Sequence, residues 1–317
     1  NSCMALIKGV TDFNALGEPD IVIEAIYEKM DAKKEVFAKL DAVCPLDTIL
    51  ATNTSTLDVN EIAETTKRPG KVIGTHFFSP ANVMKLMENV RGAQSSPQTI
   101  ATIMKLSKTI GKIGVLVGVC DGFVGNRMLY AYRRQADFLL EEGALPQQID
   151  KVLYDFGMPM GPYAMGDLAG LDVGWLIRKG QAATRPKHLR YSTVADRICE
   201  LGRFGQKTGA GWHRYEPGNR TPIPDPEIEQ LIVSISEAQG ITRREVTDQE
   251  ILERCMYPLV NEGAKILEEG LALRPGDIDI IWIYGYGFPR YRGGPMFWAD
   301  LVGVQTIYDV MSRLHDE

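Results

Sequence analysis

Short apolar runs alternate with amphipathic segments between residues 20 and 118, and this alternation constrains the fold more than any other feature of the sequence. The runs are rich in β-branched residues, whereas the segments between them carry apolar residues at helical spacing. The expected strands cover residues 20–26, 48–55, 71–78, 83–90 and 112–118, and the expected helices cover 30–44, 57–66 and 98–110. Strands separated by helices at this spacing predict a mainly parallel α/β sheet covered on both faces.

The second half of the sequence, from about residue 120, is predicted to be mostly helical and contains an internal repeat. Segments that begin at Arg127 and Arg254 share, in the same order, LEEG, ID, a Gly-Pro turn and a DL-G pattern. A duplicated helical module can bury against its own copy a face that a single module would bury in a dimer.

We predict an α/β fold in which a parallel sheet domain precedes a duplicated all-α helical domain. The expected divisions are the sheet domain at 1–120, helical copy 1 at 121–220 and helical copy 2 at 221–317.

Polar residues gather where the expected strands end, which is where parallel sheets bind their ligands. The candidates are His76, Glu88, Asn53, Ser55, Asn126, Glu28 and Lys33. His76 lies near the end of one apolar run, and Glu88 lies on the next run, which could lie beside the first.

A histidine with one ring nitrogen held by a carboxylate can accept a proton on the other nitrogen. His76 and Glu88 could form such a pair, with Ser55 and Asn126 donating hydrogen bonds to a substrate oxygen. The residues alone also allow a structural interpretation, because buried histidine–carboxylate pairs are common in protein cores. The other candidates equally suit turn caps or a solvated helix face.

Charge and cysteine content argue against several classes of function. The 41 acidic residues exceed the 35 basic ones, and no basic cluster with aromatic residues occurs, so a nucleic-acid partner is not expected. No apolar run approaches the roughly 20 residues of a membrane span. Five scattered cysteines without a CxxC pair predict reduced thiols and no metal site. The remaining histidines, expected at the surface, are His188, His213 and His315.

Six motifs, taken in order, resemble the 3-hydroxyacyl-CoA dehydrogenase family over essentially the whole chain. They are VIEAIYEKMDAKKEVFAKLD, TNTSTL, GTHFFSPANVMKLMENV, DGFVGNRML, MGPYAMGDLAGLDVGW and GRFGQKTGAGWHRY. The doubled helical half resembles the dehydrogenase part of multifunctional fatty-acid β-oxidation enzymes, including the peroxisomal bifunctional type. The resemblance implies NAD as cofactor and an acyl-CoA as substrate. It also implies that residues 1–120 form a partial Rossmann-type parallel sheet domain that binds the nucleotide. No GxGxxG turn occurs in the 317 residues, so this nucleotide-binding domain is expected to lack its glycine-rich start.

The resemblance also implies a reaction, the oxidation of L-3-hydroxyacyl-CoA to 3-ketoacyl-CoA. In that reaction His76 would take the hydroxyl proton while a hydride passes to the nicotinamide, and Glu88 would orient the imidazole. Ser55 and Asn126 match residues that contact the substrate in the family. The positions that line the nicotinamide or the CoA correspond here to Glu28, Lys33 and Asn53.

Several alternatives accompany this interpretation. A non-catalytic CoA-binding or crystallin-like member is one, although the intact His76 and Glu88 pair argues against it. A short-chain 3-hydroxybutyryl-CoA dehydrogenase is another, disfavoured by the duplication. The second copy has Glu253 where the first has Asn126, which indicates a packing copy. The resemblance further implies a fused or associated enoyl-CoA hydratase domain, and a cytoplasmic location if the protein is bacterial or a peroxisomal one otherwise.

Overall fold

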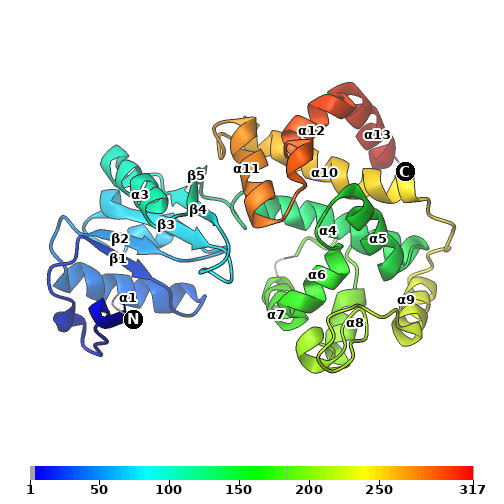
Figure 1. The fold of residues 1–317 in the computed structure, drawn as a ribbon, viewed down its shortest axis with the longest axis horizontal. Helices are drawn as coiled ribbons and strands as arrows, with labels where there is room; N and C mark the ends of the chain where they lie inside the picture. The colour runs from blue at the N-terminus through cyan, green and yellow to red at the C-terminus, as the bar shows by residue number, and fades with distance from the viewer. Residues whose placement is uncertain (1–3, 184, 317) are drawn as a thin grey trace. The chain divides into compact units, whose positions relative to one another are not determined.

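The computed structural model describes residues 4–183 and 185–316, which form two compact units (Figure 1). Unit 1 contains the residues up to Arg127 together with Gly263–Tyr286 and Gly293–Trp298. Unit 2 contains Met128–Glu262, Gly287–Arg292 and the residues from Ala299 onward. The second half of the sequence therefore contributes helices to both units, and the linear division into three domains stays a prediction.

Unit 1 contains a sheet whose five strands are arranged in the order β1-β2-β3-β4-β5. Neighbouring strands pair in parallel except β3 and β4, which are antiparallel. The strands are β1 (Ile21–Glu24), β2 (Ile49–Thr52), β3 (Val72–Phe77), β4 (Leu86–Arg91) and β5 (Ile113–Gly118). Each overlaps an expected strand, so the predicted, mainly parallel sheet is confirmed.

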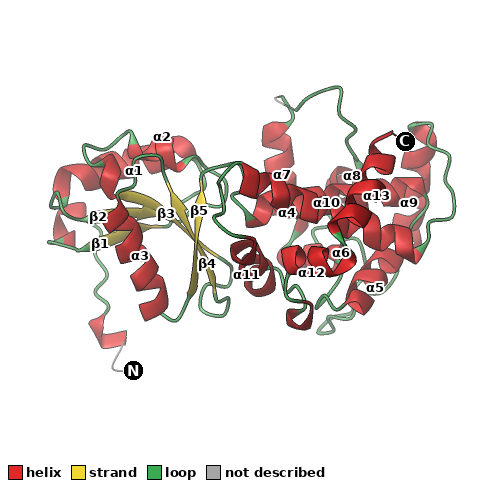
Figure 2. Ribbon diagram, turned by 90° about the horizontal axis from the view of Figure 1, so that it is seen from above, coloured by secondary structure: helices red, strands yellow, loops and turns green. Residues whose placement is uncertain are grey.

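Helices cover both faces of this sheet, as Figure 2 shows. On one face Ile73 of β3 packs with Ile103 of α3. The next residue, Gly74, points to the opposite face, where an added Cβ would lie 3.0 Å from Val59 of α2. This alternation is the strand geometry that the sequence pattern predicted. The helices that cover the two faces are α1 (Met30–Val43), α2 (Val59–Ala63) and α3 (Pro97–Thr109).

The predicted repeat is present as two sets of four helices that match in order and closely in length. The first set is α4 (Gly125–Glu142), α5 (Pro146–Phe156), α6 (Pro162–Ala169) and α7 (Leu171–Gln181). The second set is α10 (Asp248–Glu268), α11 (Pro275–Gly285), α12 (Pro295–Val302) and α13 (Val304–Asp316). Two further helices, α8 (Val194–Glu200) and α9 (Pro226–Ala238), separate the sets along the chain.

The same carboxylate device begins the third helix of each set. Asp150 of α5 accepts two backbone hydrogen bonds of 2.8 and 2.9 Å from the first turn of α6. Asp279 of α11 does the same for α12, at 2.7 and 3.3 Å. A Cβ added to Gly161 or Gly294 would lie only 2.1 or 2.3 Å from these aspartates. Each aspartate cap therefore requires a glycine beside it. The two aspartates satisfy backbone N–H groups that the start of a helix leaves unpaired.

Two ion pairs recur reciprocally between the copies. Arg127 makes a bidentate pair with Glu269, at 2.6 and 2.8 Å. Arg254, the equivalent of Arg127, pairs with Glu142, the equivalent of Glu269, and one of its two contacts is 3.1 Å long. A contact made in both directions is the pattern of a two-fold interface. These contacts support the prediction that the two copies pack on each other.

Candidate active site

Strands β3 and β4 bring His76 and Glu88 together. Their antiparallel register sets the two residues directly opposite each other. Nδ1 of His76 lies 2.7 Å from Oε2 of Glu88, and the residues are 7% and 0% exposed. An Nδ1–H donated to the carboxylate leaves the lone pair on Nε2. Nε2 has no hydrogen-bond partner within residues 4–183 and 185–316, an arrangement in which this nitrogen can accept a proton.

The first turn of α4 makes two side-chain contacts at this site, one of them to Glu88. The backbone N–H of Gly125 donates to Oε1 of Glu88 at 2.9 Å, so both carboxylate oxygens are held. Oδ1 of Asn126 accepts a hydrogen bond of 2.8 Å from the hydroxyl of Tyr286. Tyr286 directly follows α11, which means that the second helical copy reaches the predicted site residue Asn126.

Aromatic rings surround the imidazole. The ring of Phe78 lies 4.6 Å from that of His76, and the ring of Phe123 lies 5.8 Å from it. Phe78 also meets the ring of Tyr286 edge-on at 5.5 Å. Phe123 has a φ of 51°, a left-handed conformation that bulky residues rarely adopt. The chain is thus strained where it enters α4, next to the candidate base.

Glu28 organises the turn that follows β2. Its Oε1 accepts hydrogen bonds from the hydroxyl of Thr54 at 2.6 Å and from the backbone N–H and hydroxyl of Ser55 at 2.7 and 3.1 Å. Burial alone would raise the pKa of Glu28, but these hydrogen bonds and the Lys33 ammonium lower it below its usual value. Glu28 is therefore ionised, and its carboxylate holds Ser55 in place.

Lys33 is fully buried. Its ammonium donates to both carboxylate oxygens of Glu24, at 2.9 and 3.1 Å, and to the backbone oxygen of Asn53 at 2.9 Å. These contacts use its three donors. Asn53 in turn accepts from the backbone N–H of Phe77 at 3.0 Å, next to His76. Lys33 thus supports the ends of β1 and β2 from inside, and its interpretation as part of a solvated helix face is wrong.

All seven predicted site residues lie in unit 1, where Asn53 links the group around Glu28 to the strand that carries His76. Three contributors were missed by the sequence analysis: Glu24, Gly125 and Tyr286. Glu24 and Gly125 lie inside motifs that were recognised, so neighbouring candidates could have suggested them. Tyr286 is 160 residues from Asn126, and no local pattern connects the two.

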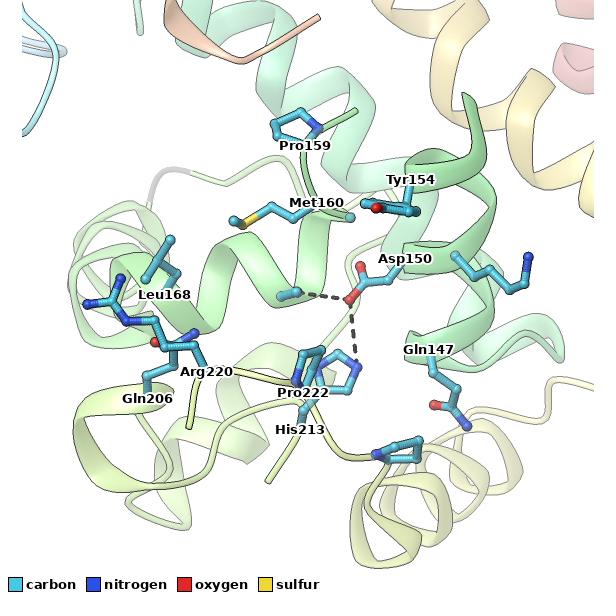
Figure 3. Close-up of a pocket in the computed structure, with 14 residues that line it drawn as sticks. Gln147, Asp150, Tyr154, Pro159, Met160, Leu168, Gln206, His213, Arg220 and Pro222 are labelled. Atoms are coloured by element: carbon cyan, nitrogen blue, oxygen red, sulfur yellow. Dashed lines mark hydrogen bonds and ion pairs between the residues drawn. The ribbon is translucent and has the colours of Figure 1, made fainter. Parts of the chain in front are cut away.

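Unit 2 contains a cavity of about 530 Å³ that includes none of the predicted site residues. Figure 3 shows Asp150 and His213 together, with Tyr154, Leu168 and Pro222 around them. Burial raises the pKa of Asp150 to about 6, although hydrogen bonds from α6 and the nearby His213 oppose this shift. Because Asp150 caps α6 as Asp279 caps α12, we interpret it as part of the helical framework.

The expectation that His213 lies at the surface is wrong, since it is 1% exposed. Asp167 of α6 accepts the backbone N–H of His213 at 3.0 Å and lies 3.3 Å from its Nδ1. On the other side, Nε2 lies 3.6 Å from Asp150. Two buried carboxylates therefore draw this loop inward. His188 is exposed as expected, and the side chain of His315 lies outside the part described.

Four of the five cysteines lie in the part of the chain that the structure describes. Cys44, Cys120, Cys199 and Cys255 are free, and Cys3 lies outside the described residues. No group of three or more metal-ligating side chains occurs within the described ranges. Among the helices of the same ranges, none has the length and apolar character that crossing a membrane requires.

Family comparisons account for almost the whole chain. Residues 1–120 match the NAD binding domain of 3-hydroxyacyl-CoA dehydrogenase, and residues 122–215 and 251–317 match its C-terminal domain. The chain belongs to the 3-hydroxyacyl-CoA dehydrogenase family. The resemblance stated from the motifs is thereby confirmed, as is NAD as the cofactor of its first domain. Two matches to one C-terminal domain agree with the repeated helices.

Two known proteins illustrate the sequence similarity. The peroxisomal bifunctional enzyme of Homo sapiens is 53% identical over 312 residues, which cover 95% of this chain and 43% of that protein. A rice protein named peroxisomal fatty acid beta-oxidation multifunctional protein is 39% identical over 317 residues, covering 99% of this chain and 44% of its own length. The chain thus spans less than half the length of these relatives.

Two solved structures agree with this family assignment. The dehydrogenase part of multifunctional enzyme 1 from C. elegans is 38% identical, with a TM-score of 0.62, covering 89% of this chain and 64% of that one. The 3-hydroxybutyryl-CoA dehydrogenase from Escherichia coli is 27% identical, with a TM-score of 0.82, covering 97% of this chain and 79% of that one.

Proposed function

We propose that this chain is the dehydrogenase part of a multifunctional fatty-acid β-oxidation enzyme. In this proposal it oxidises L-3-hydroxyacyl-CoA to 3-ketoacyl-CoA with NAD. The observation that carries the proposal is the buried His76–Glu88 pair, which has Nδ1 held at 2.7 Å and Nε2 directed to no partner within the described residues. The names of the bifunctional and multifunctional relatives support the class of substrate.

The proposed reaction moves a proton and a hydride. Nε2 of His76 accepts the proton of the 3-hydroxyl group as the C3–H bond breaks with its electron pair. NAD, when bound, supplies the acceptor for that hydride. Glu88 stabilises the imidazolium that forms and keeps its own negative charge, with its second oxygen fixed by the N–H of Gly125.

Hydrogen-bond donors would hold the substrate oxygen on which charge develops. Since Oδ1 of Asn126 already accepts from Tyr286, the Nδ2 amide hydrogens are the group left for the substrate. The hydroxyl of Ser55 would be the second donor once its single proton turns away from Glu28, which accepts it at 3.1 Å in this structure. Asn126 can thus donate without breaking its own support, whereas Ser55 exchanges its hydrogen bond to Glu28 for one to the substrate.

In this proposal the ends of β1 and β2 face the nicotinamide end of NAD. Glu28 and Asn53 are the residues that would line it, and Glu28 is 37% exposed. The buried Lys33 would act indirectly, because its ammonium lies against Glu24 and 3.7 Å from Glu28 and so balances their charges. Its contribution in this proposal is to keep the strand ends in place.

We also propose that the substrate comes from an enoyl-CoA hydratase domain, fused to or associated with this chain, and that the protein is peroxisomal. Hydration of an enoyl-CoA yields the 3-hydroxyacyl-CoA that the dehydrogenase consumes. This chain covers 43% of a relative named bifunctional, so the rest of that relative is long enough to contain a second activity. Relatives named peroxisomal support the location.

The test is the oxidation of 3-hydroxyacyl-CoA esters, followed by NADH formation, with this chain joined to a complete glycine-rich nucleotide-binding turn. Short, medium and long acyl chains should be compared. Turnover that depends on His76 supports the proposal, and its absence despite measurable NAD binding contradicts it. Activity restricted to the four-carbon ester would favour the second candidate, a 3-hydroxybutyryl-CoA dehydrogenase, which the E. coli structure suggests.

A further inference from the structure

We infer that Tyr286, contributed by the second helical copy, is a positioning residue for Asn126 in the proposed dehydrogenase reaction. The inference rests on the proposed function, because it concerns the asparagine that would hold the substrate oxygen. The hydroxyl of Tyr286 donates to Oδ1 of Asn126 at 2.8 Å. This contact fixes the orientation of the amide group. Oδ1 faces Tyr286, so Nδ2 is the atom presented to the substrate.

The hydroxyl of Tyr286 is itself held in place. Its ring is 9% exposed, stacks on Trp282 at 4.6 Å with an interplanar angle of 23°, and meets Phe78 edge-on. Such aromatic pairs restrict a ring more than burial alone. A Cβ added to Gly125 would lie 2.6 Å from the Tyr286 hydroxyl oxygen. The glycine before Asn126 therefore allows this close approach.

The duplication distinguishes this contact from the framework contacts. The aspartate caps and the arginine–glutamate pairs each occur twice, once in each copy. The positions equivalent to Asn126 and Tyr286 are Glu253 and Gly157, and a glycine has no side chain to hold a partner. Within the described residues, the contact therefore exists only beside the His76–Glu88 pair. Packing of two copies predicts a contact in both, whereas a role in one active site predicts it in one.

Tyr286→Phe tests the hydroxyl while keeping the stacked ring. Loss of one hydrogen bond of about 0.5–1.5 kcal/mol corresponds to a roughly 2- to 12-fold fall in kcat/KM. The fall should appear mainly in kcat, because charge on the substrate oxygen develops in the transition state. The matched control is Tyr291→Phe, which removes a hydroxyl that donates to the backbone oxygen of Phe156 at 3.1 Å. It should leave kcat unchanged.

A double-mutant cycle separates positioning from general stability. In an Asn126→Ala background, Tyr286→Phe should cause no further loss, because no amide remains to be oriented. An equal loss in both backgrounds, no loss in either, or the same loss for Tyr291→Phe would overturn the inference. Calorimetric titration with acetoacetyl-CoA should give nearly the same affinity for Tyr286→Phe as for the unmodified protein, because the contact acts mainly on the transition state.

The two proposals fail in different ways. If His76→Gln and Asn126→Ala keep near-normal turnover, the proposed reaction at this site is wrong. If those variants lose activity while Tyr286→Phe behaves as the unmodified protein, only the assignment of Tyr286 is wrong.

Discussion

His76 and Glu88 are held opposite each other by a pair of strands and not by a loop. They are register partners in β3 and β4, and 2.7 Å separates Nδ1 from Oε2. The backbone of Gly125 fixes the other carboxylate oxygen at 2.9 Å. A base on rigid elements, with its partner also anchored, needs little rearrangement before it accepts a proton.

Replacing His76 by glutamine should abolish most of the turnover and leave acyl-CoA binding nearly intact. The side chain that accepts the proton is lost, and such a base contributes roughly 10²- to 10⁴-fold in rate. NADH formation gives the rate, and calorimetry gives the acyl-CoA affinity. His188→Gln is the matched control, because His188 is exposed. Near-normal turnover of His76→Gln would rule out this residue as the base.

Replacing Glu88 by glutamine should lower turnover by less than the loss of His76 does. The amide can still accept from Gly125, but it no longer carries the charge that stabilises an imidazolium. Its NH₂ group would also favour the tautomer with the proton on Nε2, which removes the base from part of the population. Nitrogen NMR of the imidazole measures the tautomer, with Glu64→Gln as an exposed control. Unchanged tautomer and unchanged rate would mean that the two side chains are not coupled.

The sequence predicted what local patterns can encode. β-Branched runs located every strand of the sheet, and the position of Glu88 on the run after His76 anticipated their pairing. Lys33 was not recognised as buried, because the carboxylate of Glu24 that compensates its charge lies on a different element. His213 was misjudged for the same reason, since Asp167 holds it from α6.

Tyr286 could not be predicted from the sequence because it lies far along the chain from the other site residues. Tyr286 and Asn126 are separated by 160 residues, and only the packing of the second helical copy brings them together. The repeat itself was visible, but a repeat predicts contacts that occur in both copies. A contact made by one copy alone has no signature in a single sequence.

The reciprocal ion pairs should differ in their effect on stability, although their positions are equivalent. Arg254 and Glu142 are 9% and 17% exposed, whereas Arg127 and Glu269 are 19% and 48% exposed. Arg254→Met removes the hydrogen bonds from Arg254 to a mostly buried carboxylate, but Arg190 still contacts Glu142 at 2.7 Å, so the cost should be about 1.5–3 kcal/mol. Arg127→Met should cost at most about 1 kcal/mol. Urea denaturation measures both, and equal effects would contradict this interpretation of their burial.

The intact protein should be monomeric, because both sides of a dimer-like interface are present on one chain. The reciprocal pairs of Arg127 and Arg254 are the contacts that a two-fold dimer would make between subunits. Light scattering over a range of concentrations should give the mass of a single chain, with unchanged circular dichroism. Dissociation of an oligomer into unfolded protomers on dilution would show that the internal copy does not replace a partner.

Stability should depend on pH through Asp150. Burial raises the pKa of this carboxyl from its ordinary 3.8 to about 6 in the folded protein. Between these two values the folded state keeps a proton that the unfolded state has lost, so the free energy of unfolding falls as pH rises. The contribution is fully present below the lower value and is lost as pH rises through about 6. A shift of this size corresponds to at most about 3 kcal/mol.

Asp150→Asn should remove this dependence, because an amide does not titrate. It should also lower stability at every pH, since only one of its two terminal atoms can accept the N–H groups at the start of α6. The measurement is urea denaturation of both proteins at a series of pH values from about 4 to 7, the window that the shifted pKa defines. Asp155→Asn is the matched control, because Asp155 lies on the same helix, is exposed and pairs with Lys151. If Asp150→Asn keeps the same slope between those pH values as the unmodified protein and the control, the buried carboxyl of Asp150 is not the group that titrates.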